Sequence, residues 1–135
     1  MNKKILLLLF VIFIISIMFM SCKKFDTTAT TIENQGNTYV SIDPILGQDY
    51  KLQVTTTASG ITIGITNSTS GNKVGEAEDI DKVYQEKGSS NYSFQTGVMS
   101  GNFSILSADQ IKISFVRNTP PYLSVRDVIC TANNP

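Results

Sequence analysis

The sequence predicts an all-β protein, an antiparallel β-sandwich with about seven or eight short strands, preceded by a helical signal peptide. Apolar and polar residues alternate with period two from residue 38 onward, as in strands that bury one face. Gly, Pro and Asn recur between these runs at the spacing of short turns. One-sided apolar strands need a second layer to cover them, which favours two packed sheets.

The first 21 residues predict an export signal. Asn2-Lys3-Lys4 is a short basic start, and residues 5–20 carry no charge and one polar residue, Ser16. As a helix this apolar stretch measures about 24 Å, shorter than the ~30 Å hydrocarbon core of a bilayer. A basic start, an apolar centre and a small residue at the end are typical of a secretory signal peptide.

The residues after this stretch point to a lipid anchor. Ser21-Cys22 resembles the end of a bacterial lipobox, and residues 23–26 (KKFD) resemble the export signal of Bacteroidota lipoproteins. Phe19 and Met20 depart from the usual lipobox. The resemblance implies palmitate-type acylation of Cys22, an outer-membrane location and cell-surface display. An uncleaved membrane anchor is the alternative, although lysines on both sides orient it poorly.

Three segments follow from this pattern. We expect a signal peptide at residues 1–21, the lipidated cysteine and a flexible tether at 22–37, and a single β-sandwich domain at 38–135. The tether is polar and Thr-rich, with Phe25 and Ile32 as isolated apolar residues, so it cannot bury enough surface to fold alone.

The individual strands are placed by their alternation. The clearest runs cover residues 39–42, 50–54, 61–65, 92–94, 103–105, 111–115 and 123–130. Gly60 ends a short turn between the second and third runs, which predicts a hairpin. The phase of the last run shifts at Arg126-Asp127, which predicts a β-bulge. Residues 75–88 break the rhythm and fit either a short helix or, as we prefer, a loop leading into a short strand at 80–84.

The order of these runs resembles the galactose-binding-like jelly roll of bacterial carbohydrate-binding modules. The resemblance rests on residues 47–54, 60–65, 92–96 and 122–128, and it implies a non-catalytic sugar-binding domain. Sugar platforms in that family commonly use Trp, and this sequence has none.

Composition excludes several functions. Loss of Lys3 and Lys4 with the signal peptide lowers the basic residues from 11 to 9 against 11 acidic ones, a net charge of −2. This balance argues against nucleic-acid binding, which needs a basic patch. The absence of His removes the usual base for a Ser or Cys nucleophile, so we expect no enzyme.

Four residues are candidates for sugar binding. Tyr84 and Tyr122 lie near predicted loops and offer flat apolar rings, while Arg117 and Arg126 offer donors for sugar hydroxyls. An exposed tyrosine beside a groove with polar groups would favour glycan binding over a protein partner.

The acidic residues near position 78 and the second cysteine have simpler interpretations. Glu76, Glu78, Asp79 and Asp81 are weak calcium candidates, because their spacing does not match an EF-hand; we favour no metal and expect no cofactor. With Cys22 acylated, Cys130 has no intramolecular partner, so we expect a semi-buried strand residue, the alternative being an intermolecular disulfide.

The sequence therefore predicts a monomeric lipoprotein that contacts the membrane through its N-terminal lipid and displays a non-catalytic domain. The leading functional hypothesis is binding of an extracellular glycan or glycoconjugate. The alternative is a structural or protein-interaction lipoprotein of the cell envelope without a small-molecule ligand.

Overall fold

A computed structural model describes residues 3, 32 and 34–132 of the chain. The predicted signal peptide, apart from Lys3, lies outside the described residues, and so does Cys22. Within the described part, no helix has the length and apolar character needed to cross a membrane.

The prediction of an all-β protein is confirmed for the part of the chain that the structure describes, which forms nine strands. They are β1 (Thr38–Ser41), β2 (Tyr50–Thr56), β3 (Ile61–Asn67), β4 (Lys73–Ile80), β5 (Tyr84–Gln85), β6 (Asn91–Gln95), β7 (Met99–Ser107), β8 (Gln110–Arg117) and β9 (Leu123–Ala132). The preference for a loop followed by a strand at 80–84 is wrong. Residues 73–80 already form β4, and Val83, buried in the core, lies between β4 and the two-residue β5.

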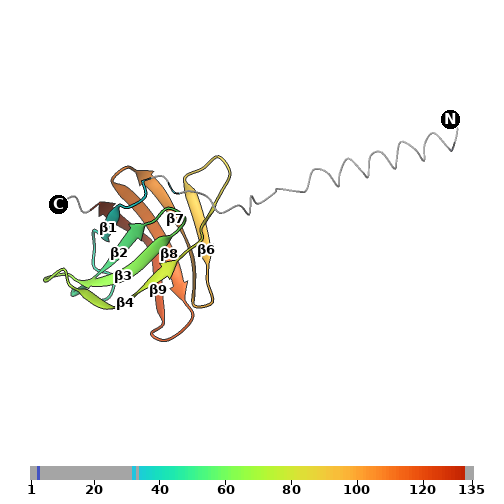
Figure 1. The fold of residues 1–135 in the computed structure, drawn as a ribbon. Helices are drawn as coiled ribbons and strands as arrows, with labels where there is room; N and C mark the ends of the chain where they lie inside the picture. The colour runs from blue at the N-terminus through green and yellow to red at the C-terminus, as the bar shows by residue number, and fades with distance from the viewer. Residues whose placement is uncertain (1–2, 4–31, 33, 133–135) are drawn as a thin grey trace.

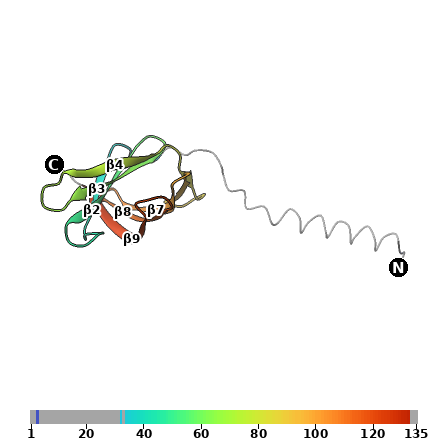
Figure 2. The same cartoon turned by 90° about the horizontal axis from the view of Figure 1, so that it is seen from below.

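All nine strands belong to one antiparallel sheet, in the order β4-β3-β2-β1-β9-β8-β7-β6-β5. The jelly-roll order expected from the sequence is not observed among these strands, because every neighbour is consecutive in the chain except the pair β1–β9. Figures 1 and 2 show that the sheet curls strongly, so that its two edges approach each other. The sheet thus covers its own apolar face by curling, which replaces the second sheet that we expected.

The interior of the curl is filled by side chains. Tyr92 and Phe103 stack there with ring centroids 4.8 Å apart. These rings and the aliphatic residues of neighbouring strands form a single core. Its buried hydrophobic members are Ile32, Tyr39, Leu52, Val54, Ile61, Ile63, Ile80, Val83, Tyr92, Phe94, Met99, Phe103, Ile111, Ile113, Phe115, Val125 and Cys130.

The predicted bulge in β9 is confirmed. On β8, Ile113 pairs with Val128, but Phe115 pairs with Val125, so β9 contains one extra residue between them. Asp127 takes up the irregularity with a φ of 49°, and its N–H donates to Ser114 Oγ at 2.8 Å. The phase shift in the sequence therefore marked a real feature of the strand.

Folded contacts begin ahead of the expected domain boundary at residue 38. Ile32 is 1 % exposed, and its N–H donates to the carbonyl of Ala58 at 3.2 Å. The N–H of Gly36 donates to the carbonyl of Thr56 at 2.7 Å. The last residues of the segment predicted as a tether thus pack on the turn between β2 and β3.

This packing distinguishes the two ends of the domain. The end that holds Ile32, called the N-terminal end here, also holds the β2–β3 and β7–β8 turns (Figure 1). The opposite end, called the loop end, holds the connections β1–β2, β3–β4, β6–β7 and β8–β9. The β8–β9 connection is the loop at the bottom of Figure 1.

Candidate functional site

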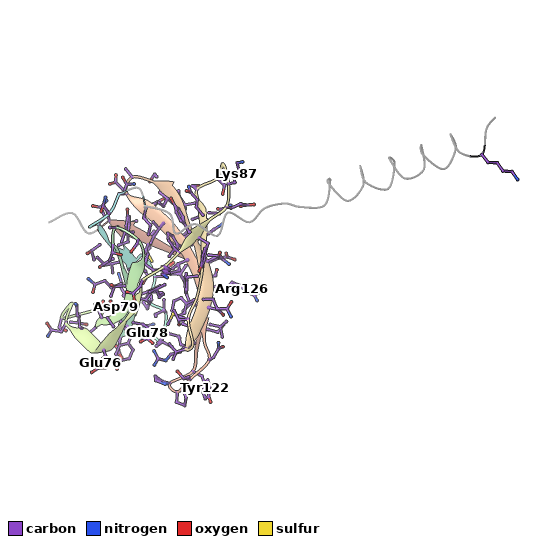
Figure 3. All side chains as sticks on the ribbon, turned by 45° about the vertical axis from the view of Figure 1, so that its right-hand side comes forward. Glu76, Glu78, Asp79, Lys87, Tyr122 and Arg126 are labelled. Carbon is purple, nitrogen blue, oxygen red and sulfur yellow. The ribbon has the colours of Figure 1, made fainter. Side chains whose placement is uncertain are left out.

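Tyr122 is the most exposed of the large hydrophobic residues, with 74 % of its surface accessible. It ends the β8–β9 connection, directly after the cis peptide bond between Pro120 and Pro121. Figure 3 shows its side chain at the loop end of the domain. A shallow depression of about 470 Å³ lies beside it, lined by Val116, Arg117, Asn118, Tyr122, Leu123 and Ser124.

Arg117 contributes to this depression but is already engaged. It continues the inward phase of Phe115 on β8, and its Nη1 lies 3.7 Å from Glu78 Oε2 on β4. Glu78 also faces inward, because it pairs with the buried Ile63. The Nε atom of Arg117 is buried without a hydrogen-bond partner. Arg117 therefore links β8 to β4 across the curl, and the sugar contacts predicted for it would compete with Glu78.

The other two candidates lie elsewhere. Arg126 is exposed beside the β9 bulge, and Figure 3 shows it well apart from Tyr122. Tyr84 is 36 % exposed on the edge strand β5, opposite Ser93 of β6. The structure thus brings Tyr122 and Arg117 to one depression and leaves Tyr84 and Arg126 outside it.

The four acidic candidates do not converge. Glu78 faces the interior, whereas its neighbour Asp79 faces outward and accepts a 2.7 Å hydrogen bond from Thr62 Oγ1. Glu76 and Asp81 are exposed. The described part of the chain contains no group of three His, Cys, Asp or Glu side chains placed to hold a metal ion.

Cys130 lies on the inner face of β9 with no exposed surface and is a free thiol. Burial raises the pKa of this thiol to about 12, because the apolar interior disfavours the thiolate. A thiol in this position packs as a small apolar group, which favours the strand-residue interpretation over an intermolecular disulfide.

A second depression, also about 470 Å³, was not anticipated from the sequence. It lies on the outer face over β9, β1, β2 and β3, and its lining includes Val40, Lys51, Gln53, Thr66 and Ser68. These residues come from three separate segments, so only the strand register reveals their proximity. The one sequence signal is that Lys51 and Gln53 alternate with the buried Leu52 and Val54.

Comparison with known proteins adds no relative: no protein-family model, curated protein or solved structure shows significant similarity to the chain.

Proposed function

We propose that the chain is a surface-displayed, non-catalytic lipoprotein of the outer membrane that binds an extracellular glycan or glycoconjugate. The observation that carries the proposal is the exposed Tyr122 beside a depression with polar groups. The two-sheet jelly roll is not part of the proposal, because the nine described strands share one sheet.

The Tyr122 depression has the chemistry that sugar binding uses. An exposed phenol ring offers a flat apolar surface for the C–H face of a sugar. The Asn118 amide and the Ser124 hydroxyl, which line the same depression, supply donors and acceptors for sugar hydroxyls. The depression is open, which suits one or two sugar units of a longer chain better than an enclosed small molecule.

The position of Tyr122 fits display from a lipid anchor. The chain enters the domain through Ile32 at the N-terminal end, and Tyr122 lies at the loop end. An anchor at Cys22 would therefore leave Tyr122 facing away from the membrane. Stable anchoring requires two or more acyl chains, which a bacterial lipoprotein cysteine carries.

A glycan array with the full chain in detergent micelles tests the binding proposal. We expect Tyr122→Ala to weaken binding by roughly tenfold, since stacking on an aromatic ring contributes about 1 kcal/mol or more. Tyr84→Ala is the matched control, because Tyr84 is less exposed and lies outside the depression. A blank array for the folded, unaltered chain would contradict the proposal, as would equal effects of the two substitutions.

The anchor is tested separately by palmitate labelling in a bacterial host. We expect Cys22→Ala to abolish the label and Cys130→Ala to retain it, because Cys130 is buried in the core. Labelling that persists in Cys22→Ala would exclude the lipoprotein assignment.

A protein-interaction role is the second candidate, and the free edge of β4 favours it. This eight-residue strand pairs only with β3, so its other edge carries unpaired backbone groups that could accept an added strand. The carboxylates of Glu76, Glu78 and Asp79 discourage pairing between two such edges. A blank glycan array with an intact fold would favour this protein-interaction role over glycan binding.

A further inference from the structure

The depression on the outer face of the sheet combines a cation with neutral polar groups. Lys51 and Gln53 come from β2, Thr66 from β3 and Ser68 from the β3–β4 turn, while Val40 of β1 supplies an apolar surface. This depression shares no lining residue with the depression beside Tyr122.

Two lysines flank Thr66 on this face. Lys51 pairs with Thr66 in the register of β2 and β3, and Thr66 pairs with Lys73 in the register of β3 and β4. Directly opposite residues in an antiparallel sheet project to the same side, with Cβ atoms about 5 Å apart. Within the described part of the chain, neither lysine forms an ion pair with a carboxylate. Two ammonium groups therefore flank Thr66, of which Lys51 lines the depression and Lys73 lies outside its lining.

The Ser68 hydroxyl is an unused polar group at the same place. Its Oγ atom is buried without a hydrogen-bond partner, although the residue lines the depression. Leaving a buried hydroxyl unpaired is costly, and a bound ligand would relieve that cost. Thr66, 7 % exposed, lines the same depression.

Backbone N–H groups of the adjoining turn are already used. The N–H groups of Thr69 and Ser70 both donate to Asn67 Oδ1 at 3.0 Å, and the N–H of Ser68 donates to the carbonyl of Asp49 at 2.7 Å. A tightly held phosphate commonly receives several free backbone N–H groups or an arginine fork in addition to any lysine, and the lining of the depression offers neither. Lys51 is the lysine in the lining, and one ammonium group with neutral side-chain donors matches the single charge of a carboxylate.

We propose that this depression is a second binding site and that it takes a carboxylate-bearing sugar of the uronic acid class. Lys51 pairs with the carboxylate, Gln53 hydrogen bonds to a ring hydroxyl, and Ser68 does so once its buried hydroxyl has rotated toward the depression. Val40 contacts the C–H face of the sugar. The site goes beyond the Tyr122 proposal, since it lies on other strands and recognises a negatively charged group.

Titrations followed by nuclear magnetic resonance test the site with four probes on the full chain in micelles: glucuronate, glucose, acetate and inorganic phosphate. We expect glucuronate to shift the amide signals of residues 51, 53, 66 and 68, with much weaker effects from the other probes. No response to glucuronate overturns the proposal. Acetate or phosphate binding as tightly as glucuronate also overturns it, because the sugar would then not be recognised.

Substitutions separate this site from its surroundings. We expect Lys51→Gln to weaken glucuronate binding by roughly tenfold or more, since a charge-assisted hydrogen bond is lost. Lys112→Gln is the matched control, because Lys112 is a half-buried lysine of β8 outside the depression. Equal effects of the two substitutions contradict the assignment.

Two further variants make the outcome decisive. Ser68→Ala should weaken glucuronate binding while leaving the free protein at least as stable, because it removes an unpaired buried hydroxyl. Tyr122→Ala should leave glucuronate binding unchanged. Loss of glucuronate binding in Tyr122→Ala would refute a separate site, whereas unchanged array binding in Tyr122→Ala with glucuronate binding intact would refute only the Tyr122 proposal.

Discussion

Cys130 lies opposite Ile111 of β8 and Ser41 of β1, on the face of β9 that the curled sheet encloses. The core around it excludes water, so the thiol keeps its proton well above the pH at which an exposed cysteine loses it. Its chemistry is thus set by the inward phase of a strand position, and a nucleophilic or redox role would require that the sheet open.

The alkaline stability of the fold tests this burial. The pKa of the Cys130 thiol rises from 9.0 to about 12 on folding, so its stabilising contribution is complete below pH 9 and declines as the pH rises toward 12. Between pH 7 and pH 10 this group should remove roughly 1 kcal/mol from the free energy of unfolding. Urea unfolding at both pH values measures the loss.

Cys130→Ala is the reference for that experiment, because the two proteins differ only in this side chain. We expect the drop between pH 7 and pH 10 to be smaller by roughly 1 kcal/mol in Cys130→Ala. Equal drops would show that the thiol titrates alike in the folded and unfolded chains.

For single residues, the alternation along a strand predicted whether a side chain faces the interior. It did not predict which side chain of another strand it contacts. Arg117 continues the inward positions of Ile113 and Phe115, so its direction was visible in the alternation. Its partner was not, since Glu78 reaches it only because the sheet curls. Lys51 and Thr66 illustrate the same limit, because the register of two strands brings them together.

At the level of elements, the sequence indicated those strands that alternate clearly between buried apolar residues and residues on the outer face. The β9 bulge was also visible, because one extra residue shifts the phase. β4 was missed for a physical reason. It is an edge strand with a single fully buried residue, Ile80, and its register with β3 slips between Ile63 and Ile65, so its alternation is weak.

The close pairing of β7 and β8 depends on Gly101. A Cβ atom at this position would meet the carbonyl oxygen of Ser114 and would lie 2.6 Å from Phe115 Cβ. Because most of the obstruction is backbone, the strands would have to separate. We expect Gly101→Ala to lower the free energy of unfolding by about 2 kcal/mol or more.

Gly64→Ala in β3 is the matched control for that substitution. A Cβ atom there would lie 3.5 Å from Ala77 Cβ, an ordinary contact, and alanine restricts the unfolded chain. Urea unfolding should therefore show a change within about 1 kcal/mol for Gly64→Ala. Similar losses in both variants would contradict the close approach of β7 and β8 at Gly101.

At the scale of the whole molecule, the sequence predicted an all-β domain but not how its strands join. Alternation shows which side chains are buried and leaves open which strands pair. The pairing of β1 with β9, in which Tyr39 lies opposite Ala132, joins the first strand to the last and creates a single sheet. Seven strands with covered faces fit a sandwich equally well, so topology rested on long-range pairing that local patterns do not encode.

The curl leaves β4 and β5 as the two edges of the sheet, and the Glu78–Arg117 pair joins β4 to β8 across the interior. The two side chains are 27 % and 24 % exposed, so water screens the pair in part. Even so, Arg117 without Glu78 would keep a buried Nε atom and lose its counter-charge. We therefore expect the pair to help hold the curled shape.

A double-mutant cycle with Glu78→Gln and Arg117→Gln measures this contribution. Each single substitution should cost on the order of 1 kcal/mol, and the double variant should cost less than their sum by about 0.5 kcal/mol, with weaker coupling at high salt. Asp79→Asn combined with Arg117→Gln is the control, because Asp79 is the neighbour of Glu78 on β4 but faces outward. Its effects should add within about 0.3 kcal/mol. Additivity of the Glu78 and Arg117 substitutions would mean that the interior contact between β4 and β8 contributes nothing to the curl, and that the core alone maintains it.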